Sequence, residues 1–384
     1  MALMTKRKIA IFSAQYYPHM GGVEEFTKGI AKALANKGCD VTVVTNDTDA
    51  VGAGTRLENG VTVLRLPCHA LLNGRLPLPR LSSSLRSLWR DLKDASFDGV
   101  VVNTRFYPHS ILGMKLARNN HARPVVIEHG SSYVSFGAPA IDAVERIYER
   151  TITRLGKRYS PRYFGVSAKS ADWLKEFSIE AEGVIHNSLD AREYCALATK
   201  RRWRAELGID EFAFLIVFAG RLIKEKGLDS LLEALELLNA KRGNYYLAIA
   251  GSGPLEEQTR RADSDHCRFV GRLDRGDLSA LFREADCLCL PTRYPEGLPT
   301  VLLEAASQHA ALIVSDCAGA REVVPDDSFG TILPEIAPCA IADAIDDYRE
   351  DRERLERCKD AVAKRVEENF SWDSSADRLL AALF

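Results

Sequence analysis

The sequence contains no apolar run close to the length of a membrane span. A transmembrane helix needs roughly 20 consecutive apolar residues, and the N-terminal stretch MALMTKRKIAIFSA contains only the short apolar segment IAIFSA after its basic residues. The apolar core of a signal peptide is longer, roughly 7–15 residues, so this segment is predicted to form a first β-strand. Any membrane contact is therefore expected to be peripheral.

A Cys-x-x-Cys pair is also missing. The chain has nine cysteines, an odd number, and Cys287 and Cys289 alternate within an apolar run that is typical of a buried strand. Scattered free thiols are typical of the reducing cytosol rather than of disulfide-stabilised secreted proteins. We expect a cytoplasmic protein, at the cytoplasmic face of the membrane if it contacts lipid.

The chain has little net charge, −2 over 384 residues, so no nucleic-acid partner is expected. The two halves differ, however. Residues 1–195 carry 26 Lys and Arg against 19 Asp and Glu, a net +7, and the remainder carries 25 against 34, a net −9. A basic half suits an anionic partner. Drift in the charge of a solvated surface explains the numbers equally well, and both interpretations stay open here.

Short apolar runs alternate with stretches of helical period along the whole chain. This pattern predicts an α/β fold in which parallel strands are covered by helices on both faces. The pattern occurs twice, which predicts two Rossmann-like domains that face a central cleft, residues 1–195 and 196–371, with a C-terminal helix 372–384 that joins the first. A single long helix is expected over about 337–368. Ligands of such domains bind at the carboxyl ends of the strands.

Two of the loops that follow strands suit phosphate groups. Gly21 and Gly22 precede a predicted helix, where the backbone can approach a ligand and the helix N-terminus attracts an anion. Arg221 and Lys226 follow the apolar run FAFLIVFAG and precede another helix. A guanidinium and an ammonium at such a place can bind a diphosphate. Each feature also has a plain structural explanation, a tight turn or a pair of solvated cations.

A complete dinucleotide-binding pattern is absent. The stretch GSGPLEE begins like G-x-G-x-x-G, but Glu256 stands where the third glycine belongs. This departure argues against a hydride-transferring enzyme.

The stretch EGLPTVLLE places Glu296 and Glu304 at the two ends of an apolar segment. Pro299 suits the first turn of a helix, so Glu296 is predicted in a loop after a strand and Glu304 in the second turn of the helix. Two carboxylates so placed could hold two hydroxyl-bearing groups of one ligand. His129 follows another strand, VVIE, in the first half, where a satisfied structural histidine is the alternative.

Taken in order, GGVE, EHG, NSLD, AGRLIKEKG, GSGP, FVGR and EGLPTVLLEA resemble the retaining glycosyltransferases of family 4, which have the GT-B fold. The resemblance extends from about residue 9 to residue 324. The sequence departs from the family pattern at Ser188 of NSLD and in EGLPT, which stands where EGFGL is frequent. The EGLPT version resembles the branch that builds lipid-linked oligosaccharides and surface polysaccharides.

The resemblance implies roles for these residues. Arg221 and Lys226 would bind the donor diphosphate and stabilise the leaving nucleotide, Glu304 the ribose, and Glu296 the donor sugar. Gly22, with Gly21, would approach the phosphate from the first domain, and His129 would lie near the anomeric centre. Backbone near the sugar, the phosphate or the base would come from Val270, Gly297, Leu298, Pro299, Thr300 and Val301. For the acceptor, the first-domain loops at Tyr16, Arg105 and Tyr107 are candidates.

The family transfers sugar with retention at the anomeric carbon, from a UDP- or GDP-linked donor to a glycan or lipid-linked glycan. An anionic lipid acceptor would suit the basic first half. The stretch LLNGRLPLPRLSSSLRSLWRDLK, with Arg86 and Arg90 beside leucines and Trp89, could lie on a bilayer surface; an ordinary covering helix is the alternative.

No metal or other cofactor is expected, because the acidic pairs Asp47/Asp49 and Asp263/Asp265 are as frequent as chance predicts. A nucleotide-sugar epimerase of the same fold and a non-catalytic nucleotide-sugar binding module remain as alternatives.

Overall fold

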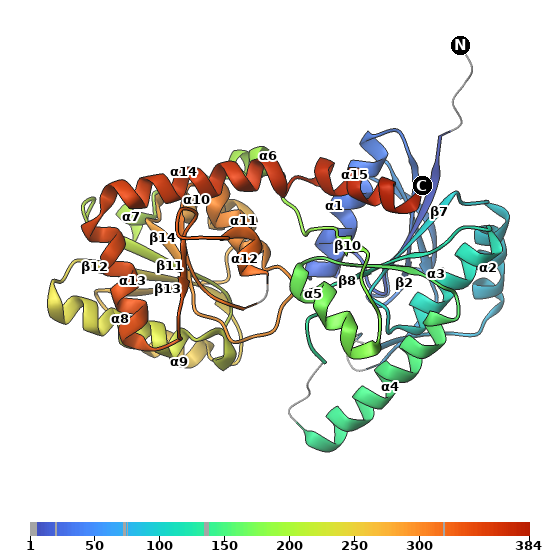
Figure 1. Cartoon of the computed structure of the whole chain (residues 1–384), viewed down its shortest axis with the longest axis horizontal. Helices are drawn as coiled ribbons and strands as arrows, with labels where there is room; N and C mark the ends of the chain where they lie inside the picture. The colour runs from blue at the N-terminus through green and yellow to red at the C-terminus, as the bar shows by residue number, and fades with distance from the viewer. Residues whose placement is uncertain (1–5, 20, 72–73, 75, 134–137, 318) are drawn as a thin grey trace, which may run out of the picture. The chain divides into compact units, whose positions relative to one another are not determined.

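The computed structural model describes residues 6–19, 21–71, 74, 76–133, 138–317 and 319–384. The chain divides into two compact units, which are described separately below. Unit 1 comprises Met1–Ser188 together with Trp372–Phe384, and unit 2 comprises Leu189–Ser371 (Figure 1). Each unit contains a parallel sheet between layers of helices, so the α/β prediction with two Rossmann-like domains is confirmed.

The division after Ser188 places the predicted boundary at 195/196 inside a helix of unit 2, α6 (Ala191–Ala196). Tyr194 of this helix is 1% exposed and belongs to the core of unit 2. The linker is polar on both sides of the division, so composition gave no signal for the exact residue. The burial of Tyr194 in the core of unit 2 is what assigns α6 to the second unit.

Unit 1 has an eight-stranded sheet with the order β10-β9-β8-β7-β1-β2-β4-β3, parallel throughout except for β3, which runs antiparallel to β4. A two-stranded ribbon of β5 and β6 is separate. The strands are β1 (Lys8–Phe12), β2 (Asp40–Asn46), β3 (Gly54–Glu58), β4 (Val61–Leu66), β5 (Cys68–Leu71), β6 (Leu76–Pro79), β7 (Gly99–Asn103), β8 (Val125–Glu128), β9 (Arg162–Gly165) and β10 (Gly183–Val184).

Alternate residues of these strands face two cores. On one face Ile9, Ile11 and their neighbours pack against α1 and α15, and on the other Ala10 and Phe12 pack against α2 and α3. The helices of unit 1 are α1 (Gly22–Asn36), α2 (Ser83–Asp94), α3 (Pro108–Asn119), α4 (Pro139–Lys157), α5 (Ala168–Trp173), the 3₁₀ turn η1 (Leu174–Phe177) and α15 (Trp372–Leu383).

The C-terminal helix α15 lies against α1, so the last helix of the chain packs on the first helix within unit 1 (Figure 1). The Trp372 ring contacts the edge of the Phe26 ring at 5.8 Å between centroids. A Cβ atom at Gly29 would lie 2.2 Å from the Trp372 ring, so α1 needs glycine there to receive α15.

Unit 2 has a six-stranded, fully parallel sheet with the order β13-β12-β11-β14-β15-β16. The order reverses between β11 and β14, where the chain crosses from one half of the sheet to the other. The strands are β11 (Phe214–Arg221), β12 (Tyr245–Ser252), β13 (Cys267–Gly271), β14 (Cys287–Leu290), β15 (Ala311–Ser315) and β16 (Thr331–Leu333). All four residues of β14 are buried, as the apolar run containing Cys287 and Cys289 predicted.

The helices of unit 2 are α6, α7 (Trp203–Glu206), the 3₁₀ turn η2 (Lys224–Lys226), α8 (Leu228–Lys241), α9 (Glu256–Arg261), α10 (Arg275–Glu284), α11 (Thr300–Ser307), α12 (Ala320–Val323), α13 (Pro338–Glu350) and α14 (Arg352–Asn369). The single long helix expected over 337–368 is wrong. Asp351 leaves the helical conformation, with φ −105° and ψ 80°, and its side chain accepts a hydrogen bond from the Arg354 N–H as the N-cap of α14.

Candidate active site

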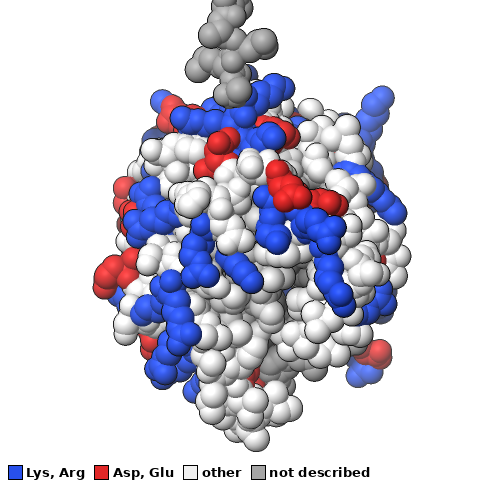
Figure 2. Space-filling view, turned by 90° about the vertical axis from the view of Figure 1, so that its right-hand side faces the viewer, with Lys and Arg blue, Asp and Glu red and all other residues white. Residues whose placement is uncertain are grey.

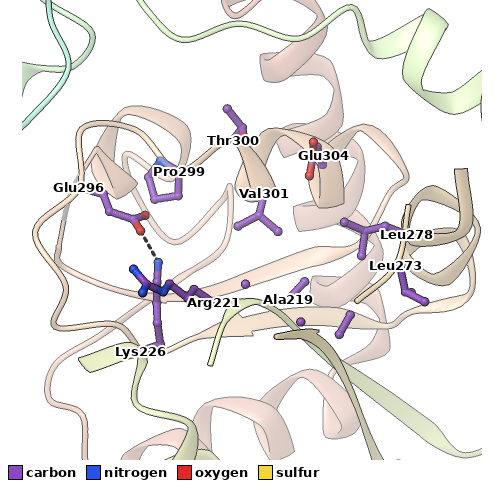
Figure 3. Close-up of a pocket in the computed structure, with 13 residues that line it drawn as sticks. Ala219, Arg221, Lys226, Leu273, Leu278, Glu296, Pro299, Thr300, Val301 and Glu304 are labelled. Atoms are coloured by element: carbon purple, nitrogen blue, oxygen red, sulfur yellow. Dashed lines mark hydrogen bonds and ion pairs between the residues drawn. The ribbon is translucent and has the colours of Figure 1, made fainter. Parts of the chain in front are cut away.

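A pocket opens in unit 2 at the point where the strand order reverses. Its volume is about 290 Å³, close to the lower end of the range of roughly 300–1,000 Å³ for small-molecule sites. It is lined by Ala219, Gly220, Arg221, Lys226, Ala250, Gly251, Leu273, Leu278, Glu296, Pro299, Thr300, Val301 and Glu304 (Figure 3). The four charged residues that the sequence singled out in this half therefore lie in one cavity.

The floor of the pocket is formed where β11 and β12 end side by side. Gly220 pairs with Gly251 in the sheet, and a Cβ atom at Gly251 would lie 1.9 Å from the Gly220 carbonyl oxygen. Any larger residue at Gly251 would push the strands apart. The sequence GSGP thus provides a flat backbone surface in the pocket rather than a dinucleotide fingerprint.

Arg221 is the last residue of β11 and its side chain is exposed. The chain then turns through η2 to Gly227, whose φ of +71° places it in the left-handed region. A Cβ atom at Gly227 would lie 2.0 Å from the carbonyl oxygen of Pro291, directly after β14. This glycine therefore holds the loops after β11 and β14 together, and it brings Lys226 beside Glu296.

The Lys226 ammonium contacts the Glu296 carboxylate at 2.5 Å, and both side chains point into the pocket near Arg221 (Figure 3). The Lys226 side chain is only 7% exposed, against 27% for Glu296. An ammonium has three donors, so the contact with Glu296 orients Lys226 and leaves donors for a second anion. The sequence reasoning gave these residues separate ligands and did not foresee that they pair with each other.

Glu296 and Glu304 lie on opposite sides of Val301 in the pocket, and Leu273 and Leu278 lie beyond Glu304 (Figure 3). Helix α11 begins at Thr300, with the extended Pro299 as its N-cap, and Glu304 follows one turn later. The first turn of a helix leaves N–H groups without an intrahelical acceptor, and the helix dipole favours an anion there. The arrangement can therefore hold an anion near Thr300 with hydroxyl groups on either side.

The apolar wall of the pocket differs from the prediction. Leu273 and Leu278 form it, whereas Val270, on β13, packs against the core of unit 2 and is not among the lining residues given above. Leu273 lies in the loop after β13 and Leu278 faces the pocket from α10. The sequence analysis expected ligand contacts in the loops after strands, and Leu273 lies in such a loop. Which residue of that region lines the pocket depends on the direction of its side chain.

In unit 1, His129 follows β8 and is held by a chain of hydrogen bonds. Its Nε2 atom lies 3.2 Å from Asn103 Oδ1, and the Asn103 amide donates to Thr27 Oγ1 at 2.7 Å. The Phe26 ring meets the His129 ring edge-on at 4.8 Å between centroids. Because the Asn103 nitrogen donates to Thr27, its oxygen is the group that accepts from His129, so His129 carries its proton on Nε2. Burial lowers the pKa of His129 to about 3, and the ring is neutral.

The helix N-terminus at Gly21 and Gly22 forms as predicted, with Gly21 as the N-cap of α1. The Glu24 carboxylate occupies this end of α1, since a Cβ atom at Gly21 would lie 2.5 Å from its Oε2 atom. Burial raises the pKa of Glu24. The sequence analysis gave Glu24 no role, although it stands in the GGVE motif, and this carboxylate competes with any anion for that helix end.

The three acceptor candidates have different surroundings. Tyr16 is 8% exposed and burial raises its pKa to about 12. Tyr107 is partly buried, and burial together with the Glu24 carboxylate raises the pKa of its phenol. Arg105 is fully buried, paired with Glu128 and Glu149 and stacked 3.8 Å over the Phe177 ring. Arg105 is therefore part of the scaffold of unit 1 and is left out of the acceptor residues proposed below.

The acidic pairs considered as metal ligands have other partners. Asp47 accepts a hydrogen bond from the Gly52 N–H, while Asp263 and Asp265 lie near Arg268. In the part of the chain that the structure describes, no group of three or more His, Cys, Asp or Glu side chains could hold a metal ion.

Comparisons with known proteins agree with this geometry. Residues 20–193 match the family model described as Glycosyltransferase Family 4, and residues 199–365 match the model described as Glycosyl transferases group 1. The chain belongs with the family 4-like GT-B glycosyltransferases. The chain is therefore a glycosyltransferase of the GT-B type.

Individual relatives are distant, and some of them match over nearly the full length of the chain. An uncharacterised glycosyltransferase of Methanocaldococcus jannaschii is 24% identical over 97% of both chains. A GDP-mannose-dependent alpha-(1-6)-phosphatidylinositol monomannoside mannosyltransferase of Mycobacterium tuberculosis is 29% identical over 43% of this chain and 46% of its own. The structure of Anabaena HepE in complex with UDP-glucose superposes with a TM-score of 0.72, at 18% identity, over 98% of this chain and 99% of that one.

Proposed function

We propose that this glycosyltransferase is a retaining, metal-independent hexosyltransferase. It moves a sugar from a UDP- or GDP-linked donor to a glycan or lipid-linked glycan in polysaccharide or glycolipid synthesis. The observation that carries the proposal is the single pocket in which Arg221, Lys226 and the start of α11 surround one place for an anion, with Glu296 and Glu304 on either side.

The donor diphosphate would occupy the pocket between the two cations and the first turn of α11. Arg221 and Lys226 then stabilise the negative charge that grows on the diphosphate as the bond to the sugar breaks, which is the main electrostatic contribution to the rate. Glu304 accepts hydrogen bonds from the ribose hydroxyls, and Glu296 accepts them from the sugar. Leu273 and Leu278 offer the base an apolar wall, and backbone of Gly297 and Leu298 lies beside the sugar.

Retention follows from displacement on one face of the sugar, with the leaving phosphate taking the acceptor proton. Neutral His129 is a hydrogen-bonding group in this scheme and not a proton donor, since its pKa is about 3. Tyr16 and Tyr107 are proposed to contact the acceptor. The mycobacterial relative, named for a phosphatidylinositol-linked substrate, supports a lipid-linked acceptor and a peripheral contact of the basic unit 1 with a membrane.

The proposal is tested by a screen of the purified protein against UDP- and GDP-sugars, without added metal and with EDTA. We expect one donor to raise Tm and to be hydrolysed slowly to the free nucleotide, with retention in the product. Release of an isomerised sugar would instead indicate the epimerase alternative. A donor that binds without turnover under any condition would indicate a binding module, and turnover that EDTA abolishes and magnesium restores would refute metal independence.

A further inference from the structure

Helix α4 of unit 1 buries acidic residues and exposes large apolar ones, which is the reverse of an ordinary surface helix. Its three acidic residues, Asp142, Glu145 and Glu149, are half-buried or buried, and Glu149 pairs with Arg105 in the interior. Large apolar residues of the same helix face solvent: Ile141 is 54% exposed, and Val144 and Ile147 are each 67% exposed. A surface helix normally buries its apolar stripe and exposes its charges.

The outward side of α4 combines an apolar stripe with a basic row. Ile141, Val144 and Ile147 follow one another at intervals of three residues and Leu155, 38% exposed, continues on the same side; we call these four residues the α4 stripe. Arg146, Arg150 and Arg154 are all exposed and recur at intervals of four, which forms a parallel row beside the stripe. Apolar and cationic groups therefore predominate on the outward side, although Thr151 is exposed within the stripe and Arg150 forms an ion pair with Glu176.

Helix α2, which the sequence suggested for membrane contact, shows the opposite arrangement. Leu85 and Leu92 are buried in the core of unit 1, and Leu88 and Trp89 pack against that core. Among the described leucines of this stretch Leu81 is the most exposed, at 89%, and Leu71 follows at 45%; Arg75 lies outside the described residues. This packing favours the ordinary covering helix for α2. Figure 2 shows a face of unit 1 on which Lys and Arg side chains predominate over Asp and Glu.

We propose that the α4 stripe and its basic row form a docking surface for an anionic lipid bilayer. An interfacial helix lies in the membrane plane with its apolar residues among the acyl chains and its Lys and Arg side chains at the headgroups. Each basic residue near an anionic leaflet adds to the attraction. The inference rests on the proposed lipid-linked acceptor for its purpose, but docking itself requires no transfer of sugar.

A second copy of the chain fits the surface less well. In a symmetric dimer the same patch contacts itself, so the arginine row of one copy would face that of the other. Like charges so opposed disfavour association, whereas an anionic surface neutralises them. Since no described helix could cross a membrane, the contact would be peripheral.

The test is flotation of the full chain with phosphatidylcholine vesicles, with and without phosphatidylglycerol. We expect binding only to the anionic vesicles, weaker at high salt. The double variant V144S/I147S should reduce the partition coefficient by at least about tenfold, because it removes the apolar contact. The double variant R146Q/R154Q should weaken the part of the vesicle binding that depends on salt concentration. The control L81S removes the most exposed leucine of the α2 region and should leave binding unchanged.

Unchanged circular dichroism and unchanged donor hydrolysis in V144S/I147S would show that the fold and unit 2 are intact. Wild-type protein that ignores anionic vesicles, or a double variant that binds them as well as wild type, would overturn the proposal. So would a wild-type dimer in sedimentation equilibrium that V144S/I147S converts to monomer, since the stripe would then be a contact between copies. Vesicle binding without turnover of any donor would leave docking standing and refute the proposed function alone.

Discussion

The two units use the carboxyl ends of their sheets in opposite ways. In unit 2 the loops after β11 and β14 enclose a pocket whose charged groups reach ligand-accessible space. In unit 1 the polar residues at the ends of β7 and β8 interact with other residues of the protein. Asn103 forms hydrogen bonds with Thr27 and His129, and Arg105 forms an ion pair with Glu128. One sheet end leaves its charged groups in an open pocket, and the other holds His129 in a fixed orientation.

The difference teaches that a place after a strand does not by itself separate a ligand-binding residue from a scaffold residue. Arg221 and Arg105 both follow apolar strands, yet Arg221 is exposed in a pocket and Arg105 is fully buried. What separates them is the presence of internal carboxylates. A buried guanidinium needs such partners, because an unpaired charge in the interior is very costly.

The largest effect is expected from the exposed arginine. Arg221→Ala should lower the turnover of the donor about 10²–10³-fold, the size of losing one preorganised charge on a leaving group, with little change in Tm. The measurement is the rate of nucleotide release at saturating donor. Lys224→Ala is the matched control, since Lys224 is an exposed cation in the same loop and does not line the pocket. Equal losses in both variants would mean that the loop, and not the guanidinium, is needed.

The two carboxylates of the pocket should separate in their effects. Glu296→Gln removes the charge that orients Lys226, so it should lower turnover by roughly tenfold or more while the Kd for the free nucleotide changes little. Glu304→Gln should do the reverse and raise the Kd for the free nucleotide, because the contact with the ribose is lost. Calorimetric titration with UDP and GDP, beside the turnover assay, measures both. If Glu296→Gln weakened the nucleotide as much as Glu304→Gln, the assigned division between sugar and ribose would be wrong.

These cases show how far the sequence leads. The alternation of apolar runs and helical stretches predicted both sheets, because burial periods are local signals. The stretch EGLPTVLLE likewise predicted Glu296 in a loop and Glu304 within α11, because the position of a proline is a local signal. The Lys226–Glu296 pair and the wall of Leu273 and Leu278 depend on which way side chains point after the loops close. The burial of the acidic residues of α4 could not be predicted either, since a helical period shows that a helix has two faces but not which face is buried.

In unit 1 the expected effect is smaller, because Asn103 acts through His129. Asn103→Ala removes the acceptor of the His129 Nε2 proton, so the ring loses its orientation, and turnover should fall about tenfold with an unchanged Kd for the nucleotide. Asn46→Ala is the control: Asn46 is also a buried amide at a strand end, and its side chain donates to the Ala14 carbonyl instead. A similar loss in Asn46→Ala would reduce the role of Asn103 to general stability.

The smallest effect concerns the buried carboxylates around Arg105. Burial raises the pKa of Glu149 from its usual 4.5 to about 8, with the neighbouring Glu145 contributing. Between these two values the unfolded chain releases the proton that the folded chain retains, so this group makes folding less favourable as pH rises from about 4.5 to 8. Glu149→Gln cannot ionise and still offers Arg105 an acceptor oxygen. Its Tm should therefore exceed that of wild type by roughly 2–4 °C at pH 8 and match it near pH 5.

Thermal unfolding across this pH range measures the difference, with Glu176→Gln as the control. Glu176 forms an ion pair with Arg150 that is largely exposed to solvent, so its loss should shift Tm little and equally at both pH values. A Glu149→Gln variant that is less stable than wild type at pH 8 would mean that Glu149 is ionised there. Arg105 would then be held by an ionised Glu149, as Lys226 is held by Glu296 in unit 2. The two units would no longer differ in having a neutral carboxyl group beside the buried Arg105 and a charged carboxylate in the pocket.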